Sequence, residues 1–438
     1  MNVLNGHLTL LFLRATGFHP SVLLPNLRAL KWRPYIITRS QPNSFQTVLS
    51  VLFLWRLLVP SLVSLDVSLT DSDDESLHSF LANYPLLCPN LKSIVISVGA
   101  PERVSRTTID VLSRAITRHE HLDRFDISAP INDVGLTHIA LSLQVKKLSL
   151  VLHPVKSNPY RICIPSDGIP FRTVEDLALE VWDLSCVMTL LRPQDQTFRS
   201  FTLCHHSPLT PEAVSALFTA LVSRHRAHSL RSLTLWPDCF AQEGHRDAPV
   251  DLDEPFVRQH LSYDAFRPLS SLCYLTKLVL DLGYCFSIDD DDLVSLTRNW
   301  PCLQALLLYC QQYVYDHPWR WAKYVTFRGL LSVLASCPDL REITSPLDAR
   351  VVPVDMGDVV CNPSLTYLYF PESPIIDADS VADLILRHFP SVTEVTTSFN
   401  VLPEAQDDDI EVYQGLWCLV DSYFRDMYVS EDDSDEDA

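Results

Sequence analysis

One short apolar pattern recurs along the chain, and it constrains the fold more than any other feature. An apolar residue, two variable residues, an apolar residue, one variable residue and a third apolar residue occur in this order in eleven of thirteen copies, and the other two have Ser345 or Thr397 at the third position. The starting positions are Leu27, Leu62, Leu91, Leu122, Val145, Val174, Phe198, Leu230, Leu275, Leu303, Leu340, Leu365 and Val392. Seven of the twelve intervals between successive starts are 20–29 residues long, a period typical of stacked supersecondary units. The chain is therefore predicted to be a repeat array.

Proline gives an independent check on this pattern. It stands two residues before seven of the thirteen starts, whereas 30 prolines in 438 residues predict about one. Because proline cannot continue a helix, it favours a helix end and the turn into a strand. Apolar residues have helical spacing in the segments 72–83, 107–118, 132–143, 210–221, 289–298, 327–336 and 379–388. We therefore expect an α/β solenoid, or horseshoe, with a parallel inner sheet and outer helices.

Two intervals are longer than the others and are expected to contain insertions. Segment 238–268 is polar and rich in Pro, Asp and His, which predicts an excursion on the surface. Segment 311–323 is crowded with aromatic residues.

Glycine is scarce, and its scarcity argues against a compact doubly wound α/β domain and against several enzyme classes. The chain has 10 glycines, and the closest pair, Gly6 and Gly17, is eleven positions apart. Dinucleotide-binding, P-loop, protein-kinase and nucleophile-elbow motifs all need clustered glycines that bring backbone amides against a phosphate or an oxyanion. We expect no enzymatic activity and no cofactor.

The net charge of −20 is unevenly distributed along the chain. Residues 404–438 contain thirteen acidic residues and one basic residue, a net charge of −12, so residues 1–403 carry −8. A nucleic-acid partner is not expected, because binding to phosphates requires a basic face. We predict an N-terminal segment over residues 1–20 that is a remnant or a cap, a solenoid over 21–400, a C-terminal cap over 401–429 and a disordered acidic tail over 430–438.

Metal binding, disulfides and membrane insertion are not expected either. The 12 cysteines contain no Cys-x-x-Cys pair, and the histidines near His119 and His121 form no metal-binding motif. The run Asp289–Asp292 lacks the alternating ligands of a calcium loop and suits the first turn of a helix. The hydrophobic segment Val48–Val63 is too short to cross a bilayer. We expect a cytoplasmic and/or nuclear protein.

Several repeats resemble those of a known family. Segments 287–310 and 325–340 resemble the cysteine-containing leucine-rich repeat, and segments 24–32 and 60–65 look like the opening repeats of fungal F-box/leucine-rich-repeat proteins. The resemblance covers about residues 20–400. It implies a substrate receptor of an SCF-type ubiquitin ligase, in which an F-box binds a Skp-type adaptor and the repeats hold a protein substrate.

The N-terminus departs from that family. Only 26 residues precede the first repeat pattern, and Met1–Asn26 lacks the Leu-Pro-x-Glu opening of an F-box. The chain is thus expected to be truncated or to be a repeat-only relative, and a Skp-type adaptor is expected only if an F-box lies upstream. The alternative function is a leucine-rich-repeat scaffold or GTPase regulator that is unconnected to ubiquitin.

The variable residues of each strand are expected to face outward, on the concave side of the sheet. In the first half they are mostly charged and include Lys31, Asp66, Arg124, Asp126, Lys147 and Asp176. In the second half they and the aromatic insertion supply Trp236, Lys277, Tyr309, Tyr313, Trp319, Trp321, Tyr367 and Tyr369. Aromatic residues beside Lys or Arg are common anchors of protein interfaces, so we predict a partner-binding surface between Leu230 and Phe370 on a chain that is a monomer within a complex. In the alternative interpretation, these rings pack on one another or under the insertion.

The acidic tail offers two candidate phosphorylation sites. Ser430 precedes Glu-Asp-Asp and Ser434 precedes Asp-Glu-Asp, which is the pattern for an acid-directed kinase. In the alternative interpretation, the tail is never modified.

Overall fold

The computed structural model describes residues 26–33, 54–55, 57–69, 74–98, 104–152, 170–191, 197–207, 209–222, 229–237, 260–282, 285–309, 324–353, 361–399 and 408–432. They belong to two compact units, Met1–Phe198 (unit 1) and Arg199–Ala438 (unit 2). Thirteen strands of one sheet follow one another in chain order, and every pairing between them that the structure describes is parallel. The predicted α/β solenoid with a parallel sheet is confirmed.

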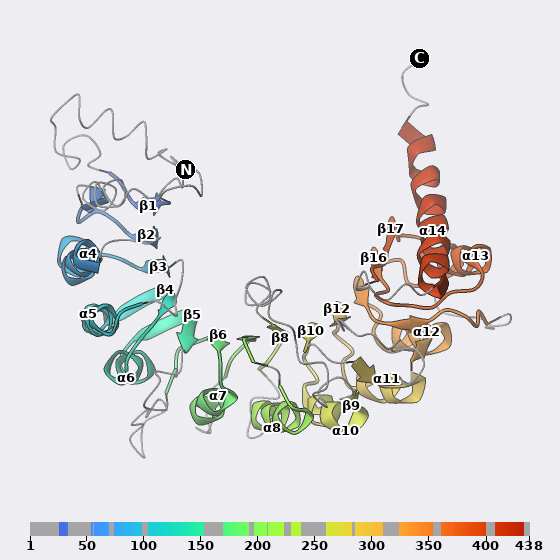
Figure 1. Ribbon diagram of the computed structural model, residues 1–438, viewed down its shortest axis with the longest axis horizontal. Helices are drawn as coiled ribbons and strands as arrows, with labels where there is room; N and C mark the ends of the chain where they lie inside the picture. The colour runs from blue at the N-terminus through green and yellow to red at the C-terminus, as the bar shows by residue number, and fades with distance from the viewer. Residues whose placement is uncertain are drawn as a thin grey trace. The chain divides into compact units, whose positions relative to one another are not determined.

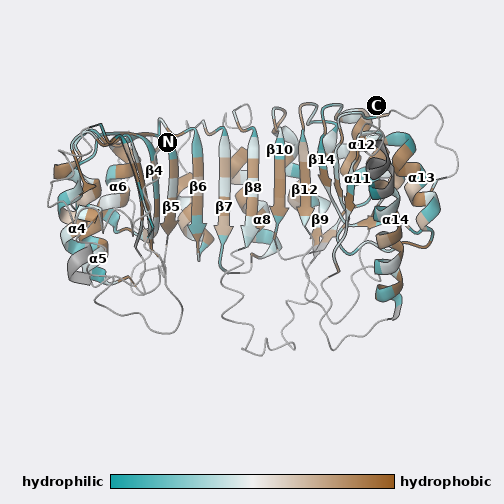
Figure 2. Cartoon of the chain, turned by 90° about the horizontal axis from the view of Figure 1, so that it is seen from above, coloured by the Kyte–Doolittle hydropathy of each residue, from teal (hydrophilic) through white to brown (hydrophobic). Residues whose placement is uncertain are grey.

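Unit 1 alternates strands with helices that all lie on one side of its sheet (Figure 1). Its elements are β1 (Ala29–Trp32), β2 (Ser64–Leu69), α4 (Asp74–Leu87), β3 (Ser93–Val98), α5 (Arg106–Ile116), β4 (His121–Pro130), α6 (Asp133–Leu141), β5 (Gln144–Leu152), β6 (Asp176–Val181) and α7 (Leu184–Leu191). Polar and apolar residues alternate along strands such as β6 (Figure 2), so one face of the sheet meets the helices and the other does not. We call the second face the helix-free face.

Unit 2 repeats this arrangement and ends in a long helix. Its main-sheet strands are β7 (Ser200–His205), β8 (Ser232–Pro237), β10 (Lys277–Asp281), β12 (Ala305–Tyr309), β14 (Glu342–Thr344), β16 (Tyr367–Tyr369) and β17 (Glu394–Thr396). Its helices are α8 (Pro211–Val222), α10 (Tyr263–Phe266), the 3-10 helix η4 (Arg267–Ser271), α11 (Asp290–Thr297), α12 (Phe327–Ser336), α13 (Ala378–His388) and α14 (Asp408–Asp432). Short strands β9 (His260–Ser262) and β11 (Cys285–Ser287) pair with each other, as do β13 (Val325–Thr326) and β15 (Leu347–Asp348).

The recurring apolar pattern explains why the strands stack in register. The second apolar positions pair across neighbouring strands, as in Leu65 with Ile94 and Leu278 with Leu306. All of the starting positions except Leu27 are buried. A recurring pair of backbone hydrogen bonds positions the start of each strand. For β10, the amides of Thr276 and Lys277 both donate to the Arg231 carbonyl, at 2.7 and 3.0 Å. Each strand therefore begins where the previous repeat supplies an acceptor.

The helix starts follow the expected capping chemistry. Asp289 accepts from the Asp292 amide while the Asp292 carboxylate accepts from the Asp289 amide, which is a capping box. The acidic run Asp289–Asp292 thus has the predicted role at the first turn of a helix. Thr210 likewise accepts from the Ala213 amide at 3.2 Å, at the predicted start of α8.

One prediction about an insertion is wrong in part. Residues 260–268, expected to belong to a surface excursion, form β9, α10 and the start of η4. Leu261 of β9 is buried, and so are Phe266 and Leu269, which supply the apolar face of this repeat's helical segment. Residues 238–259 and the whole aromatic insertion, 311–323, lie outside the described residues.

Helix α14 closes the C-terminal end of unit 2. It begins inside the predicted cap segment 401–429 and extends to Asp432, so it includes the first three residues of the segment 430–438 that was expected to be a disordered tail. Its Trp417 indole packs on Phe370 and donates to the Ser373 carbonyl at 2.8 Å. Among the described helices, none combines the length and the hydropathy needed to cross a membrane.

Candidate functional site

The candidate site is the helix-free face of unit 2, along strands β8 to β17. Five of the eight predicted partner-binding residues are described, and all five lie on this face, because they alternate with buried residues such as Leu235, Leu280 and Leu308. Trp236 is 50% exposed at the end of β8, and Lys277 is exposed at the start of β10. Tyr309, Tyr367 and Tyr369 are half-buried. The predicted Tyr313, Trp319 and Trp321 lie outside the described residues.

The tyrosines of β12 and β16 form a small cluster with neighbouring hydroxyl groups. The Tyr309 and Tyr369 rings contact each other with centroids 6.1 Å apart and planes at 53°. The Tyr369 hydroxyl is hydrogen-bonded to the Ser398 hydroxyl, and the Thr396 hydroxyl donates to the Tyr367 hydroxyl at 3.3 Å. These contacts fix the rings while leaving part of each one accessible. The alternative interpretation, in which the aromatic rings pack on one another, is thus correct for Tyr309 and Tyr369. It does not apply to Trp236, which is 50% exposed.

Residues that the sequence analysis did not single out complete this surface. Val279 and Leu307 face the same way as the tyrosines and are only 8% exposed, so the face has an apolar floor. The exposed Glu342 and Glu394 add carboxylates to it, and Asp281, which is only 7% exposed, adds a third one in the floor. Strand alternation places all five on the same face as Lys277, but none of them is aromatic or basic, the two residue types that the sequence prediction relied on.

Burial changes the acidity of the cluster. Loss of water contact is the main reason that the pKa values of Tyr309 and Tyr369 are raised. Tyr367 and the carboxylate of Asp281 act in the same direction on both rings. The two phenols are therefore neutral hydrogen-bonding groups at physiological pH.

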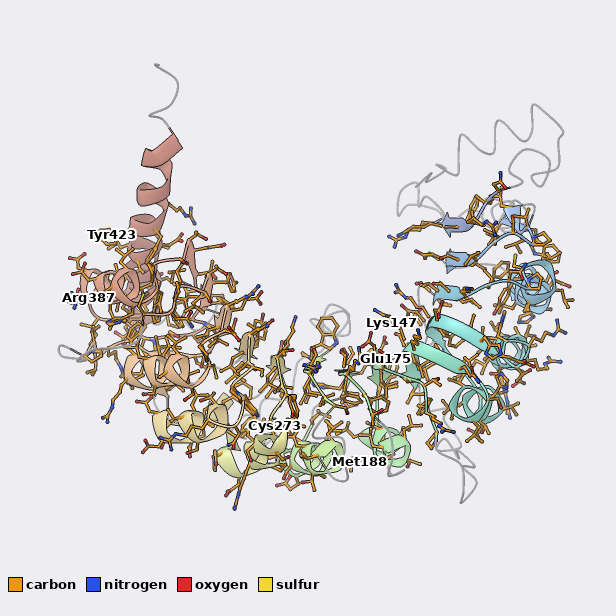
Figure 3. All side chains as sticks on the ribbon, turned by 180° about the vertical axis from the view of Figure 1, so that it is seen from behind. Lys147, Glu175, Met188, Cys273, Arg387 and Tyr423 are labelled. Atoms are coloured by element: carbon orange, nitrogen blue, oxygen red, sulfur yellow. The ribbon has the colours of Figure 1, made fainter. Side chains whose placement is uncertain are left out.

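The helix-free face of unit 1 has a different chemistry. Six of its charged residues form pairs: Lys31 with Asp66 at 3.3 Å, Arg124 with Asp126 at 2.9 Å, and Lys147 with Asp176 at 3.3 Å. Figure 3 shows Lys147 on this face and Met188 on helix α7, on the other side of the sheet. A partner that used these charges would first have to separate pairs that already neutralise each other.

Other side chains that could bind a metal, act as nucleophiles or be phosphorylated are dispersed through the two units. Burial, with a smaller effect of His138, lowers the pKa of His119 to about 4, and burial also lowers the pKa of His205. Within the described part of the chain, no three His, Cys, Asp or Glu side chains come close enough to hold a metal ion. Cys88 and Cys337 are buried thiols whose pKa is raised by burial to about 12, so they are poor nucleophiles.

Of the two candidate phosphorylation sites, Ser430 lies in α14 and Ser434 lies outside the described residues.

Comparison with known proteins gives no family for this chain. No protein-family model matches the sequence, and no curated protein matches it. The fold is similar to a chain of the Rad7 and Elc1 complex from yeast, with 14% sequence identity and a TM-score of 0.44 over 92% of this chain and 85% of that chain. The described residues repeat strand and helix units built on a leucine-type pattern and thus form a leucine-rich-repeat solenoid.

Proposed function

We propose that this protein is a protein-binding module and that the helix-free face of unit 2 holds the partner. One observation carries the proposal: in-register strands place Trp236, Tyr309, Tyr367 and Tyr369 on a face that no described helix covers. Aromatic anchors around an apolar floor, with polar residues beside them, are the usual composition of protein interfaces. The role is one of binding rather than catalysis.

The resemblance of the repeats supports a more specific role. As a proposal, the partner is a substrate that the chain, or a longer form of it with an upstream F-box, presents to an SCF-type ubiquitin ligase in the cytoplasm or nucleus. A Skp-type adaptor is expected to bind only such a longer form.

Affinity capture from the native cell tests the binding surface. The wild-type chain is compared with the triple variant Tyr309→Ala, Tyr367→Ala and Tyr369→Ala. A control triple variant, Lys31→Ala, Arg124→Ala and Lys147→Ala, removes three outward side chains from unit 1 instead. Circular dichroism and thermal melting first establish that both variants are folded.

The two variants are expected to behave differently. Proteins captured by the wild type and by the control should be lost with the tyrosine variant. Equal capture by all three chains would refute the proposed surface. For the ligase role, the captured partner should have a longer half-life in cells that carry only the tyrosine variant, and an unchanged half-life would refute that role while leaving the binding surface intact.

A further inference from the structure

The helix-free face of unit 2 contains an aromatic frame around a carboxylate. Asp281 pairs with Tyr309 in the register of β10 and β12. On the other side, Leu280 pairs with Leu235, so the next residue, Trp236, flanks Asp281 from β8. All three residues lie on the same face, because Leu235, Leu280 and Leu308 before them are buried on the other.

The spacing of this frame suits a single cation. Neighbouring strands are about 4.8 Å apart, so the backbones that carry Trp236 and Tyr309 are separated by roughly 10 Å across β10. A cation interacts with an aromatic ring when it lies within about 6 Å of the ring centroid. A cationic group above Asp281 can therefore contact both rings. Tyr369, whose ring contacts that of Tyr309, extends the frame by one more aromatic side chain.

The charge of the surrounding face favours the same kind of ligand. Among the outward strand positions from β8 to β17, the charged residues are Asp281, Glu342, Glu394 and Lys277, which sum to −2. Lys277 lies four residues from Asp281 on the same strand, about 13 Å away at 3.3 Å per residue. The only outward ammonium on these strands thus lies well away from the frame. An anionic ligand would be repelled by the three carboxylates.

The geometry points to recognition of an arginine or lysine side chain from an extended segment of the protein partner, held between Trp236 and Tyr309 above Asp281. This inference rests on the proposed function and names the chemistry of the partner at that surface. A planar guanidinium can stack on the rings while it donates to the carboxylate, so arginine suits the frame better than lysine. The carboxylate supplies the charge selection and the rings supply the contact area.

Selection from a random 12-residue peptide library displayed on phage provides the test. The full chain is the bait, and four forms are compared: wild type, Asp281→Asn, Trp236→Leu and Asp176→Asn. Asp176→Asn is the matched control, because it removes an outward strand aspartate from unit 1, where Asp176 pairs with Lys147 at 3.3 Å. Trp236→Leu alters a half-exposed side chain and so remains informative if Asp281→Asn fails to fold.

The expected result is enrichment of arginine, and less strongly of lysine, at one position of the selected peptides. Synthetic copies should bind Asp281→Asn at least about tenfold more weakly and Trp236→Leu about two- to fivefold more weakly. Their affinity for Asp176→Asn should equal that for the wild type, and added salt should weaken binding.

Two other outcomes separate the failure of this inference from the failure of the proposed function. In the first outcome, the selected peptides show no enrichment of basic residues, and their binding is unchanged by Asp281→Asn and Trp236→Leu but is lost in the triple tyrosine variant. This result would overturn recognition of a cation and would still support the binding surface. If no peptides are selected, or if those selected bind the triple tyrosine variant as well as the wild type, both inferences are overturned.

Discussion

Replacing Gly329 with alanine should destabilise unit 2 through a contact between two neighbouring helices. Gly329 lies in the first turn of α12, and a Cβ atom there would lie 2.1 Å from Oδ1 and 3.0 Å from Cα of Asp290 on α11. The Asp290 carboxylate accepts from the amide and the hydroxyl of Thr326, each at 2.7 Å. The new methyl group would have to displace this carboxylate, and it also crowds the α11 backbone.

The magnitude follows from what is broken and what is gained. Each hydrogen bond to a charged group contributes about 1.5–3 kcal/mol to stability, so the loss of the two bonds costs about 3–6 kcal/mol. Alanine in place of glycine within a helix returns about 1 kcal/mol. We expect Gly329→Ala to lower the free energy of unfolding by about 2–5 kcal/mol by this reckoning.

Urea unfolding, followed by circular dichroism with a constant m-value, measures this change. The matched control is Gly415→Ala in α14, where an added Cβ atom meets nothing within 4 Å. The control should raise stability by up to about 1 kcal/mol. Equal effects of the two substitutions, or a stabilising effect of Gly329→Ala, would refute the reasoning. In an Asp290→Ala background the cost of Gly329→Ala should become smaller, because the displaced carboxylate is no longer there.

Three further predictions concern single residues. Lys147→Ala should change the unfolding free energy by less than about 1 kcal/mol, because its pair with Asp176 is exposed; a larger change in urea unfolding would contradict this. His119 is buried and stacked on Tyr84, and its folded pKa of about 4 lies below the unfolded value near 6.5. Stability should therefore fall as pH decreases from 6.5 to 4, by up to about 3 kcal/mol, and His119→Gln should flatten this part of a pH series of urea midpoints; an unchanged slope would count against it. Trp417→Phe should cost about 1–3 kcal/mol, since the Ser373 carbonyl loses its donor, and Trp417→Ala about 3–5 kcal/mol; thermal melting that ranks the two in the opposite order would argue against the capping role of α14.

Much of the fold could be predicted because one periodic signal specifies both strand position and strand face. The helix predicted over 107–118 is α5, Arg106–Ile116, and the one over 327–336 is α12 with the same bounds. Helix starts could be predicted because capping residues such as Asp289 and Thr210 bond to amides only three residues away in the sequence. The strand pattern likewise placed Tyr309 and Tyr369 on one face.

What the sequence analysis missed depends on distances across the fold rather than along the chain. The pairing of Asp281 with Tyr309 is set by the register of two strands that are 28 residues apart in the sequence. Alternation within one strand predicts which face a side chain lies on, but not which residue of the neighbouring strand lies beside it. The structural role of Gly329 was hidden for the same reason, because Asp290 lies 39 residues earlier. β9 and α10 were missed because the 45-residue interval that contains them has no second copy of the repeat pattern to mark its apolar spacing.

Site-specific photo-crosslinking tests the central claim most directly. A benzophenone amino acid is placed at Trp236 on the helix-free face of unit 2, or at the exposed Ala335 on helix α12 of the same unit, and native cells expressing each chain are irradiated. If the helix-free face binds the partner, position 236 should form a discrete adduct with another polypeptide and position 335 should form none. Adducts at position 335 with none at position 236 would contradict the account.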